Sequence, residues 1–116
     1  KEPAKGTFDL PGGFCDSYET AEEGVIREIE EETGLKVNST RYLFSIPNIY
    51  IYSGMELHTM DMFFHCTVED AAKLTADDDV AELQWIAIDK LRSEDFGLAS
   101  IKKGIEKIKK QHTIKK

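Results

Sequence analysis

Residues 13–35 read GFCDSYETAEEGVIREIEEETGL, so a loop that starts on glycine passes into a strongly acidic segment. From Glu19 to Thr33 helix-forming residues dominate, acids occupy the first turn, and Gly34 follows as a helix stop. The pattern predicts a helix over residues 19–33 that packs through a narrow apolar stripe and leaves its other face strongly acidic.

Helical spacing places three glutamates, Glu28, Glu31 and Glu32, on one face of this helix. Each like-charge pair costs a few tenths of a kcal/mol, so stability alone does not explain the arrangement. One interpretation is a solvated acidic surface, which is common on helices. The other is a metal platform, because carboxylate oxygens are ligands that Mg²⁺ and Mn²⁺ prefer. Arg27 lies four residues from both Glu23 and Glu31 and can pair with either of them.

The residues around these glutamates follow a longer pattern. Nine positions fit the motif G-x5-E-x7-R-E-U-x-E-E-x-G-U, in which U is a bulky aliphatic residue: Gly13, Glu19, Arg27, Glu28, Ile29, Glu31, Glu32, Gly34 and Leu35. A chance match is expected on the order of once in 10⁹ windows. The chain therefore resembles the Nudix family, whose motif this is. The resemblance extends to Leu10-Pro11-Gly12 and to the segment from Trp85 to Leu91.

This resemblance implies a divalent metal cofactor, Mg²⁺ or Mn²⁺. Glu28, Glu31 and Glu32 would bind the metal, and the carbonyl oxygen of Gly12 would be a further ligand. Arg27 would orient one of the glutamates. A bound metal neutralises phosphate charge and lowers the pKa of a bound water, which then attacks phosphorus in line.

The family often adds an acidic residue from a later loop, shortly before the closing tryptophan. Asp79, as a metal ligand, and Glu82 are the candidates here, and Asp79 stands where close relatives often have glutamate. The general base is either Glu28, the first choice, or Glu82. The implied function is hydrolysis of the diphosphate bond in a nucleoside diphosphate derivative. The alternative is a non-catalytic domain that senses such a nucleotide, and a Nudix-fold isomerase ranks third.

Residues 45–53 read SIPNIYIYS and resemble in part the S-Q-P-W-P-F-P-x-S segment of NADH pyrophosphatases. Ser45, Pro47 and Tyr50 carry the match together with Ser53, which makes NADH one candidate substrate beside ADP-ribose. Tyr50 and Tyr52 could stack on a base. In the alternative interpretation, Pro47 and the following asparagine only form a turn between two strands, with the tyrosines in the core or at its edge.

The rest of the chain alternates between strand and helix signals. Strands are predicted over residues 7–10, on both sides of Pro47, over 56–69 and over 83–88, and an amphipathic helix begins near Leu98. This order predicts an α/β or α+β fold with a mixed sheet. The resemblance implies a Nudix-like α/β/α sandwich.

Length and charge restrict the remaining possibilities. The 116 residues suffice for a single domain, residues 1–116, with the motif at 13–35. The net charge is −7, and residues 1–95 carry 8 basic against 21 acidic side chains. Such a body repels polyanions, so we expect a small-molecule substrate approached through cations and no nucleic-acid partner. With neither a bilayer-spanning apolar run nor a signal peptide, we expect no membrane contact and a cytoplasmic location.

Only twelve residues precede Gly13, fewer than Nudix domains usually carry before the motif. We therefore expect the first strands of the domain to be missing. A missing strand leaves a sheet edge unpaired, which favours either self-association, for example as a homodimer, or instability of the fold.

Overall fold

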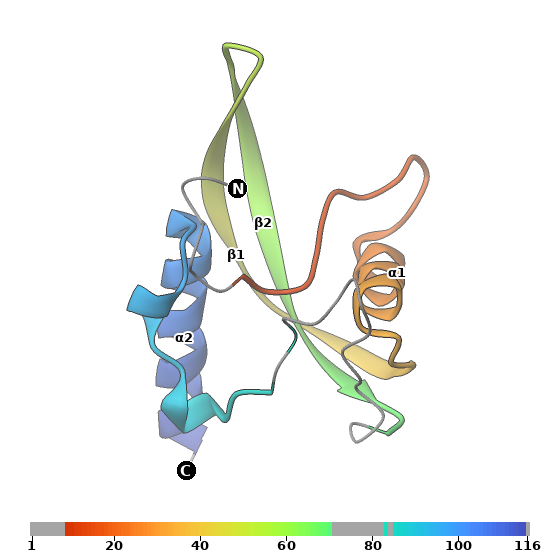
Figure 1. The fold of residues 1–116 in the computed structure, drawn as a ribbon, viewed down its shortest axis with the longest axis vertical. Coiled ribbons are helices and arrows are strands. Elements are labelled where there is room, and N and C mark those ends of the chain that lie inside the picture. Colours follow the sequence, from red (N-terminus) through yellow and green to blue (C-terminus); the bar gives the residue numbers. More distant parts are fainter. Residues whose placement is uncertain (1–8, 71–82, 84, 116) are drawn as a thin grey trace. The chain divides into compact units, whose positions relative to one another are not determined.

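The computed structural model describes residues 9–70, 83 and 85–115 (Figure 1). In chain order the elements are α1 (Ala21–Thr33), β1 (Val37–Tyr52), β2 (Met55–Val68), the 3-10 turns η2 (Ile88–Lys90) and η3 (Ser93–Asp95), and α2 (Ala99–Lys115). This mixture of helices with a two-stranded sheet confirms the predicted α+β class. The chain forms two compact units, of which one comprises residues 11–44 and 64–85, and the other residues 1–10, 45–63 and 86–116.

Helix α1 is the helix predicted over residues 19–33, and it begins two residues later because Thr20 is its N-cap. The Thr20 hydroxyl accepts a hydrogen bond from the backbone N–H of Glu23 at 3.0 Å. The Glu23 carboxylate in turn accepts one from the backbone N–H of Thr20 at 2.9 Å, which completes a capping box. Gly34 ends the helix in the left-handed conformation, as predicted.

Strands β1 and β2 form one long hairpin that turns at Ser53 and Gly54 (Figure 1). Both turn residues have positive φ, 50° and 76°, which matches the twist that a two-residue hairpin turn requires. The alternative that Pro47 lies in a turn between two strands is wrong, because β1 continues through it. Proline is tolerated in an edge strand, where its missing N–H breaks no ladder bond. The strand predicted over 56–69 is confirmed as β2.

The strand predicted over residues 83–88 is wrong for the residues that the structure describes there. Leu83 and residues 85–87 belong to no helix or strand, and Ile88 begins η2. Trp85 is 60% exposed. Aromatic and β-branched residues form a strand only where a neighbouring strand pairs with them, so their presence misled the prediction. Of the strand predicted over 7–10, Asp9 and Leu10 are not in a strand, and the other two lie outside the described residues.

In the unit that contains α1, the end of the helix is tied to the strands that follow it. Leu35 and Phe44 are buried in its core. The Glu30 carboxylate accepts a hydrogen bond from the first N–H of β1, at Val37, over 3.1 Å. Where β2 ends, the backbone N–H of Glu69 donates to the carbonyl of the residue that precedes β1, over 2.8 Å. These hydrogen bonds and the buried side chains hold α1, and with it the acidic face, against the strands of this unit.

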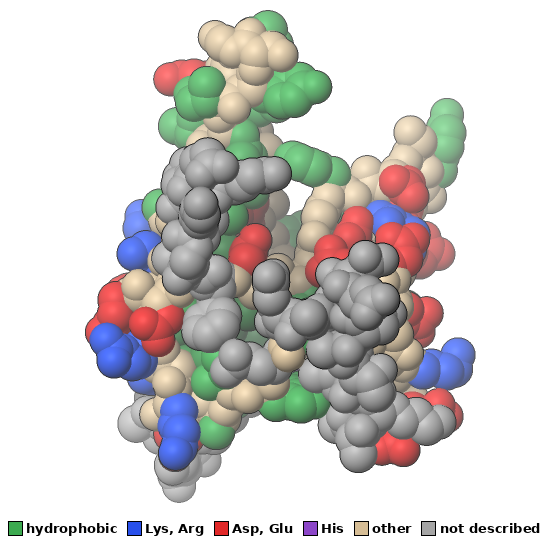
Figure 2. Space-filling model, in the orientation of Figure 1, with side chains coloured by type: hydrophobic (Ala, Val, Ile, Leu, Met, Phe, Trp, Pro, Cys, Tyr) green, Lys and Arg blue, Asp and Glu red, His purple; other side chains and the backbone are tan. Residues whose placement is uncertain are grey.

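In the other unit, α2 packs on the hairpin through a small apolar core, which consists of Ile46, Phe63, Phe96 and Ile105. The buried Ser100 hydroxyl donates to the Asp61 carboxylate at 2.5 Å, which joins the first turn of α2 to β2. Hydrophobic side chains remain exposed toward the hairpin turn (Figure 2). Within the described part of the chain, no helix is both long and apolar enough to cross a membrane.

Gly104 lies inside α2 because the ring of Phe63 occupies the space that a side chain would need. A Cβ at this position would overlap the Phe63 ring. Although alanine is favoured in helices by about 1 kcal/mol, we expect Gly104→Ala to lower the free energy of unfolding by about 1–2 kcal/mol, because overpacking costs more. Thermal or urea unfolding measures the change. Lys103→Ala, an exposed neighbour, is the control, and an equal loss in both variants would contradict the overlap.

Candidate functional site

The loop of residues 11–20 lies against α1, and at Gly13 a side chain would have no room beside the helix. A Cβ on Gly13 would lie 2.7 Å from Oε2 of Glu28 and 2.9 Å from its carboxyl carbon. Glycine thus leaves room for the Glu28 carboxylate directly beside the loop backbone. The first glycine of the motif and its first helical glutamate are therefore linked by packing.

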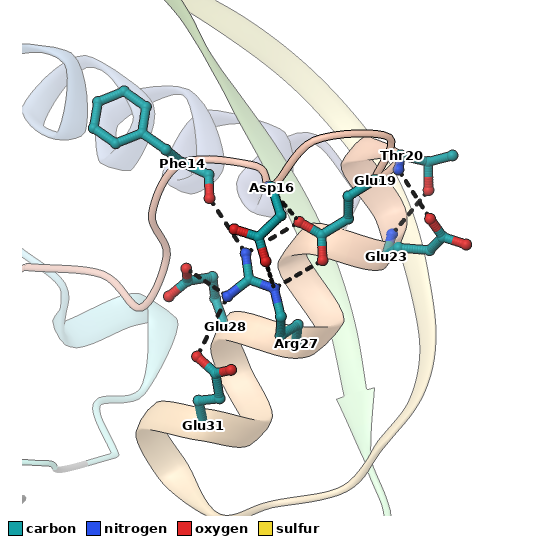
Figure 3. A network of polar contacts seen from close by, with 8 residues as sticks. All are labelled: Phe14, Asp16, Glu19, Thr20, Glu23, Arg27, Glu28 and Glu31. Atoms are coloured by element: carbon teal, nitrogen blue, oxygen red, sulfur yellow. Dashed lines mark hydrogen bonds and ion pairs between the residues drawn. The ribbon is translucent and has the colours of Figure 1, made fainter.

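Arg27 is the centre of a network of polar contacts between the loop and α1 (Figure 3). Its Nε donates to Oε2 of Glu19 at 2.7 Å, and its Nη2 donates to Oε1 of the same carboxylate at 3.1 Å. Nε also lies 3.3 Å from the Asp16 carboxylate. The backbone N–H of Asp16 donates to Glu19 at 2.7 Å, which closes the loop on itself. The bidentate contact fixes the guanidinium plane.

The remaining donors of Arg27 point toward the middle of α1 and back to the loop. Nη1 donates to Oε2 of Glu28 at 3.1 Å and to Oε1 of Glu31 at 3.3 Å. Nη2 donates to the backbone carbonyl of Phe14 at 3.2 Å. One guanidinium therefore places the loop backbone and two motif carboxylates in a single arrangement (Figure 3).

Burial and charge reinforce this arrangement. The side chains of Glu19 and Glu28 are mostly covered, at 13% and 17% exposure, whereas Glu31 is 62% exposed. The hydrogen bonds from Arg27 and from the Asp16 backbone lower the pKa of Glu19 below its ordinary value. The same pairing raises the pKa of Arg27, so the pair is ionised at neutral pH. The acidic side chains on and around α1 are visible in red in Figure 2.

Three observations bear on whether the glutamates suit a divalent metal. Carboxylates are the hard oxygen donors that Mg²⁺ and Mn²⁺ bind, and the Gly13 cradle places one of them beside the loop backbone. In the arrangement that the structure describes, one oxygen each of Glu28 and Glu31 faces Arg27. Among the described residues, no three acidic, histidine or cysteine side chains are already arranged around an ion position. The donor set therefore fits a hard cation, provided that the carboxylates reorient around it.

The other residues expected at a metal site have different positions. Glu32 is half-buried on α1, and Gly12 lies in the exposed loop next to Gly13. Asp79 and Glu82 lie outside the described residues. Of the two partners predicted for Arg27, Glu31 makes the contact. Glu23 is occupied by the capping box instead.

The residues predicted to bind substrate belong to the other compact unit. Ser45 and Pro47 lie within β1, as do Tyr50, which is half-buried, and Tyr52, which is exposed. Burial, followed by the nearby Asp61 carboxylate, raises the pKa of Tyr50. Tyr50 is therefore a neutral phenol at physiological pH.

Sequence reasoning named Glu19 as a motif position but did not pair it with Arg27. It missed two other members of the Arg27 network, Asp16 and Phe14, altogether. Asp16 is one of many acidic residues in the sequence. Phe14 contributes through its backbone carbonyl, and such a contact cannot be recognised from the identity of the side chain. The only available signal was their place between two fixed positions of the motif, in a loop that must return to the helix.

Comparison with known proteins places these features in context. The family model described as NUDIX domain matches residues 1–107. An ADP-ribose pyrophosphatase of Methanocaldococcus jannaschii is 40% identical over 91 residues, which cover 77% of this chain and 51% of that protein. An NAD-capped RNA hydrolase NudC of Pseudomonas aeruginosa is 26% identical over 74% of this chain and 29% of that protein.

A solved structure, the crystal structure of a UDP-X diphosphatase, superimposes with a TM-score of 0.62 at 28% identity. The match covers 89% of this chain and 48% of that one. The chain thus spans about half the length of the ADP-ribose pyrophosphatase and of this structure. The name of the NudC relative includes RNA, so the comparisons give no support to the expectation that nucleic acid is excluded.

Proposed function

The chain belongs to the NUDIX family, and from this we propose that it hydrolyses the diphosphate bond of nucleoside diphosphate derivatives with the help of a divalent metal. The observation that carries the proposal is the Arg27 network, in which one guanidinium holds Glu28 and Glu31 beside the loop. Folding alone gives no reason to gather these like charges on one helix face. A function that uses their combined negative charge, such as binding a cation, explains why they lie together.

In this proposal Glu28, Glu31 and Glu32 hold Mg²⁺ or Mn²⁺, with the Gly12 carbonyl as a further ligand and Asp79 as an additional acid. The bound metal neutralises the charge of the diphosphate and activates water for attack. This neutralisation is needed because the net negative charge of the protein would otherwise repel an anionic substrate.

The attacking water must lose a proton, and Glu28 is our first choice as its acceptor. Oε2 of Glu28 accepts the Arg27 hydrogen bond, whereas Oε1 is not used in that bond and can take the proton. Glu82 is the alternative base. Arg27 acts as a positioning residue, because its contacts fix where the Glu28 carboxylate lies.

NADH and ADP-ribose are the proposed substrates. The similarity to an ADP-ribose pyrophosphatase and to a UDP-X diphosphatase supports a molecule with two groups joined by a diphosphate. Ser45, Pro47, Tyr50 and Tyr52 are proposed to contact the nucleoside. The homodimer and the cytoplasmic location stay predictions.

A substrate panel tests the proposal. The chain is incubated with NADH, ADP-ribose, a UDP-sugar, a dinucleoside polyphosphate and a nucleoside triphosphate, each with Mg²⁺, with Mn²⁺ and with a chelator. We expect cleavage of NADH or ADP-ribose to a nucleoside monophosphate and a second phosphorylated fragment, and no cleavage with the chelator. Tight binding without turnover would instead support a nucleotide-sensing domain, and turnover in the chelator would contradict metal dependence.

A further inference from the structure

Phe14 is an aromatic residue that the proposed chemistry does not use, although it lies in the loop that carries Gly13. The residue is 69% exposed, while its carbonyl accepts the hydrogen bond from Nη2 of Arg27 at 3.2 Å. In Figure 3 the ring points away from the carboxylates that surround Arg27. The backbone of Phe14 is thus held in place while most of the residue stays exposed.

The backbone of Phe14 is held beside the carboxylates by two contacts, one at the residue before it and one at its own carbonyl. Gly13, the residue before it, lies against the Glu28 carboxylate. The donor group that holds the Phe14 carbonyl belongs to the same guanidinium that contacts Glu28 and Glu31. When the phosphates of a ligand lie at these glutamates, the planar apolar ring of Phe14 is therefore nearby, in the loop next to them.

We propose that the Phe14 ring is a stacking platform for the planar base of a nucleotide whose phosphates lie at Glu28 and Glu31. This inference rests on the proposed function and extends it to base recognition. Aromatic rings bind bases through their faces without reading hydrogen-bond pattern, so Phe14 selects for the presence of a planar ring rather than for one base. Diphosphates without such a ring gain nothing from it.

Steady-state kinetics with matched variants test this role. Stacking is a binding interaction, so Phe14→Ala is expected to raise KM for ADP-ribose about tenfold and to leave kcat nearly unchanged. Phe14→Trp, which restores a larger ring, is expected to return KM to the parent value or below. An abasic analogue, with both sugars and the diphosphate but no base, should show the same KM with all variants.

Tyr18→Ala is the matched control, because Tyr18 is a fully exposed aromatic residue of the same loop. Its KM should equal that of the parent. An unchanged KM in Phe14→Ala would overturn the proposal. An equal rise in KM for ADP-ribose and for the abasic analogue would also overturn it, because the substitution would then have disturbed the loop rather than stacking.

A binding measurement separates this inference from the hydrolysis itself. Saturation-transfer NMR with AMP and Mg²⁺ detects contact between protein and adenine protons without any turnover. We expect the parent and Tyr18→Ala to bind AMP with equal apparent affinity. For Phe14→Ala we expect an apparent affinity about tenfold lower. If no diphosphate is cleaved but this difference appears, the hydrolase proposal fails and the stacking site stands. If AMP binds the parent and Phe14→Ala equally, the stacking site fails whatever the activity.

Discussion

Replacing Glu31 or Glu32 with glutamine is expected to lower kcat/KM for the cleaved substrate by at least about 100-fold. Glutamine keeps the size of the side chain and removes one negative charge, so the change isolates the electrostatic contribution. Losing one group that stabilises developing charge typically costs about 10²–10³ in rate. The Glu31 side chain is 62% exposed, so we expect little change in folding stability from its replacement.

Initial rates at saturating Mg²⁺, measured beside thermal unfolding, check this expectation. Glu22→Gln is the matched control, because Glu22 is an exposed glutamate on the first turn of the same helix and outside the network. Its rate should stay within about twofold of the parent. Full activity in both Glu31→Gln and Glu32→Gln would remove these residues from the metal site and leave Glu28, the Gly12 carbonyl and the later acids as the remaining candidate ligands.

The sequence was most informative where local signals act alone. The start of α1 was predicted two residues early, because the capping box of Thr20 and Glu23 was not part of the prediction. Gly34 ends the helix as predicted, through a hydrogen bond from its backbone N–H to the carbonyl of Glu30, four residues back. The three motif glutamates share a face because helical periodicity fixes their neighbours. These features could be predicted because no distant part of the chain competes with them.

Prediction failed where local structure depends on residues that are distant in the sequence. Pro47 is a turn signal in isolation, yet β1 runs through it because the hairpin turns at Ser53 and Gly54 instead. Trp85 and Ile88 carry strand propensity, and the structure uses neither in a strand. Strand formation is decided by pairing across the sheet, which single-chain patterns do not contain.

The sequence left the partner of Arg27 open for a similar reason. Spacing permits an ion pair with Glu23 or with Glu31, and the requirement for an N-cap decides between them, because Glu23 satisfies the Thr20 backbone. The contacts with Asp16 and Phe14 depend on the path of the loop, so they become visible only in three dimensions.

Arg27→Lys is expected to lower kcat/KM by about 10- to 100-fold, the range for groups that orient metal ligands. Lysine keeps the positive charge but has one terminal nitrogen, whereas Arg27 uses three nitrogens to contact Glu19, Glu28 and Phe14 together. A lysine cannot make these contacts at once, so the loop and the Glu28 carboxylate lose their common anchor. The metal concentration that gives half-maximal rate should rise with the same substitution.

Activity titrated against Mg²⁺ distinguishes loss of position from loss of charge. Arg41→Lys, at an exposed position on β1, is the control and should match the parent in both rate and metal dependence. Arg27→Gln removes the positive charge as well, so a further fall beyond Arg27→Lys is expected if that charge contributes. If Arg27→Lys keeps the parent's rate and metal dependence, then positive charge near α1 suffices, and the hydrogen-bonding geometry of the guanidinium is not what positions Glu28.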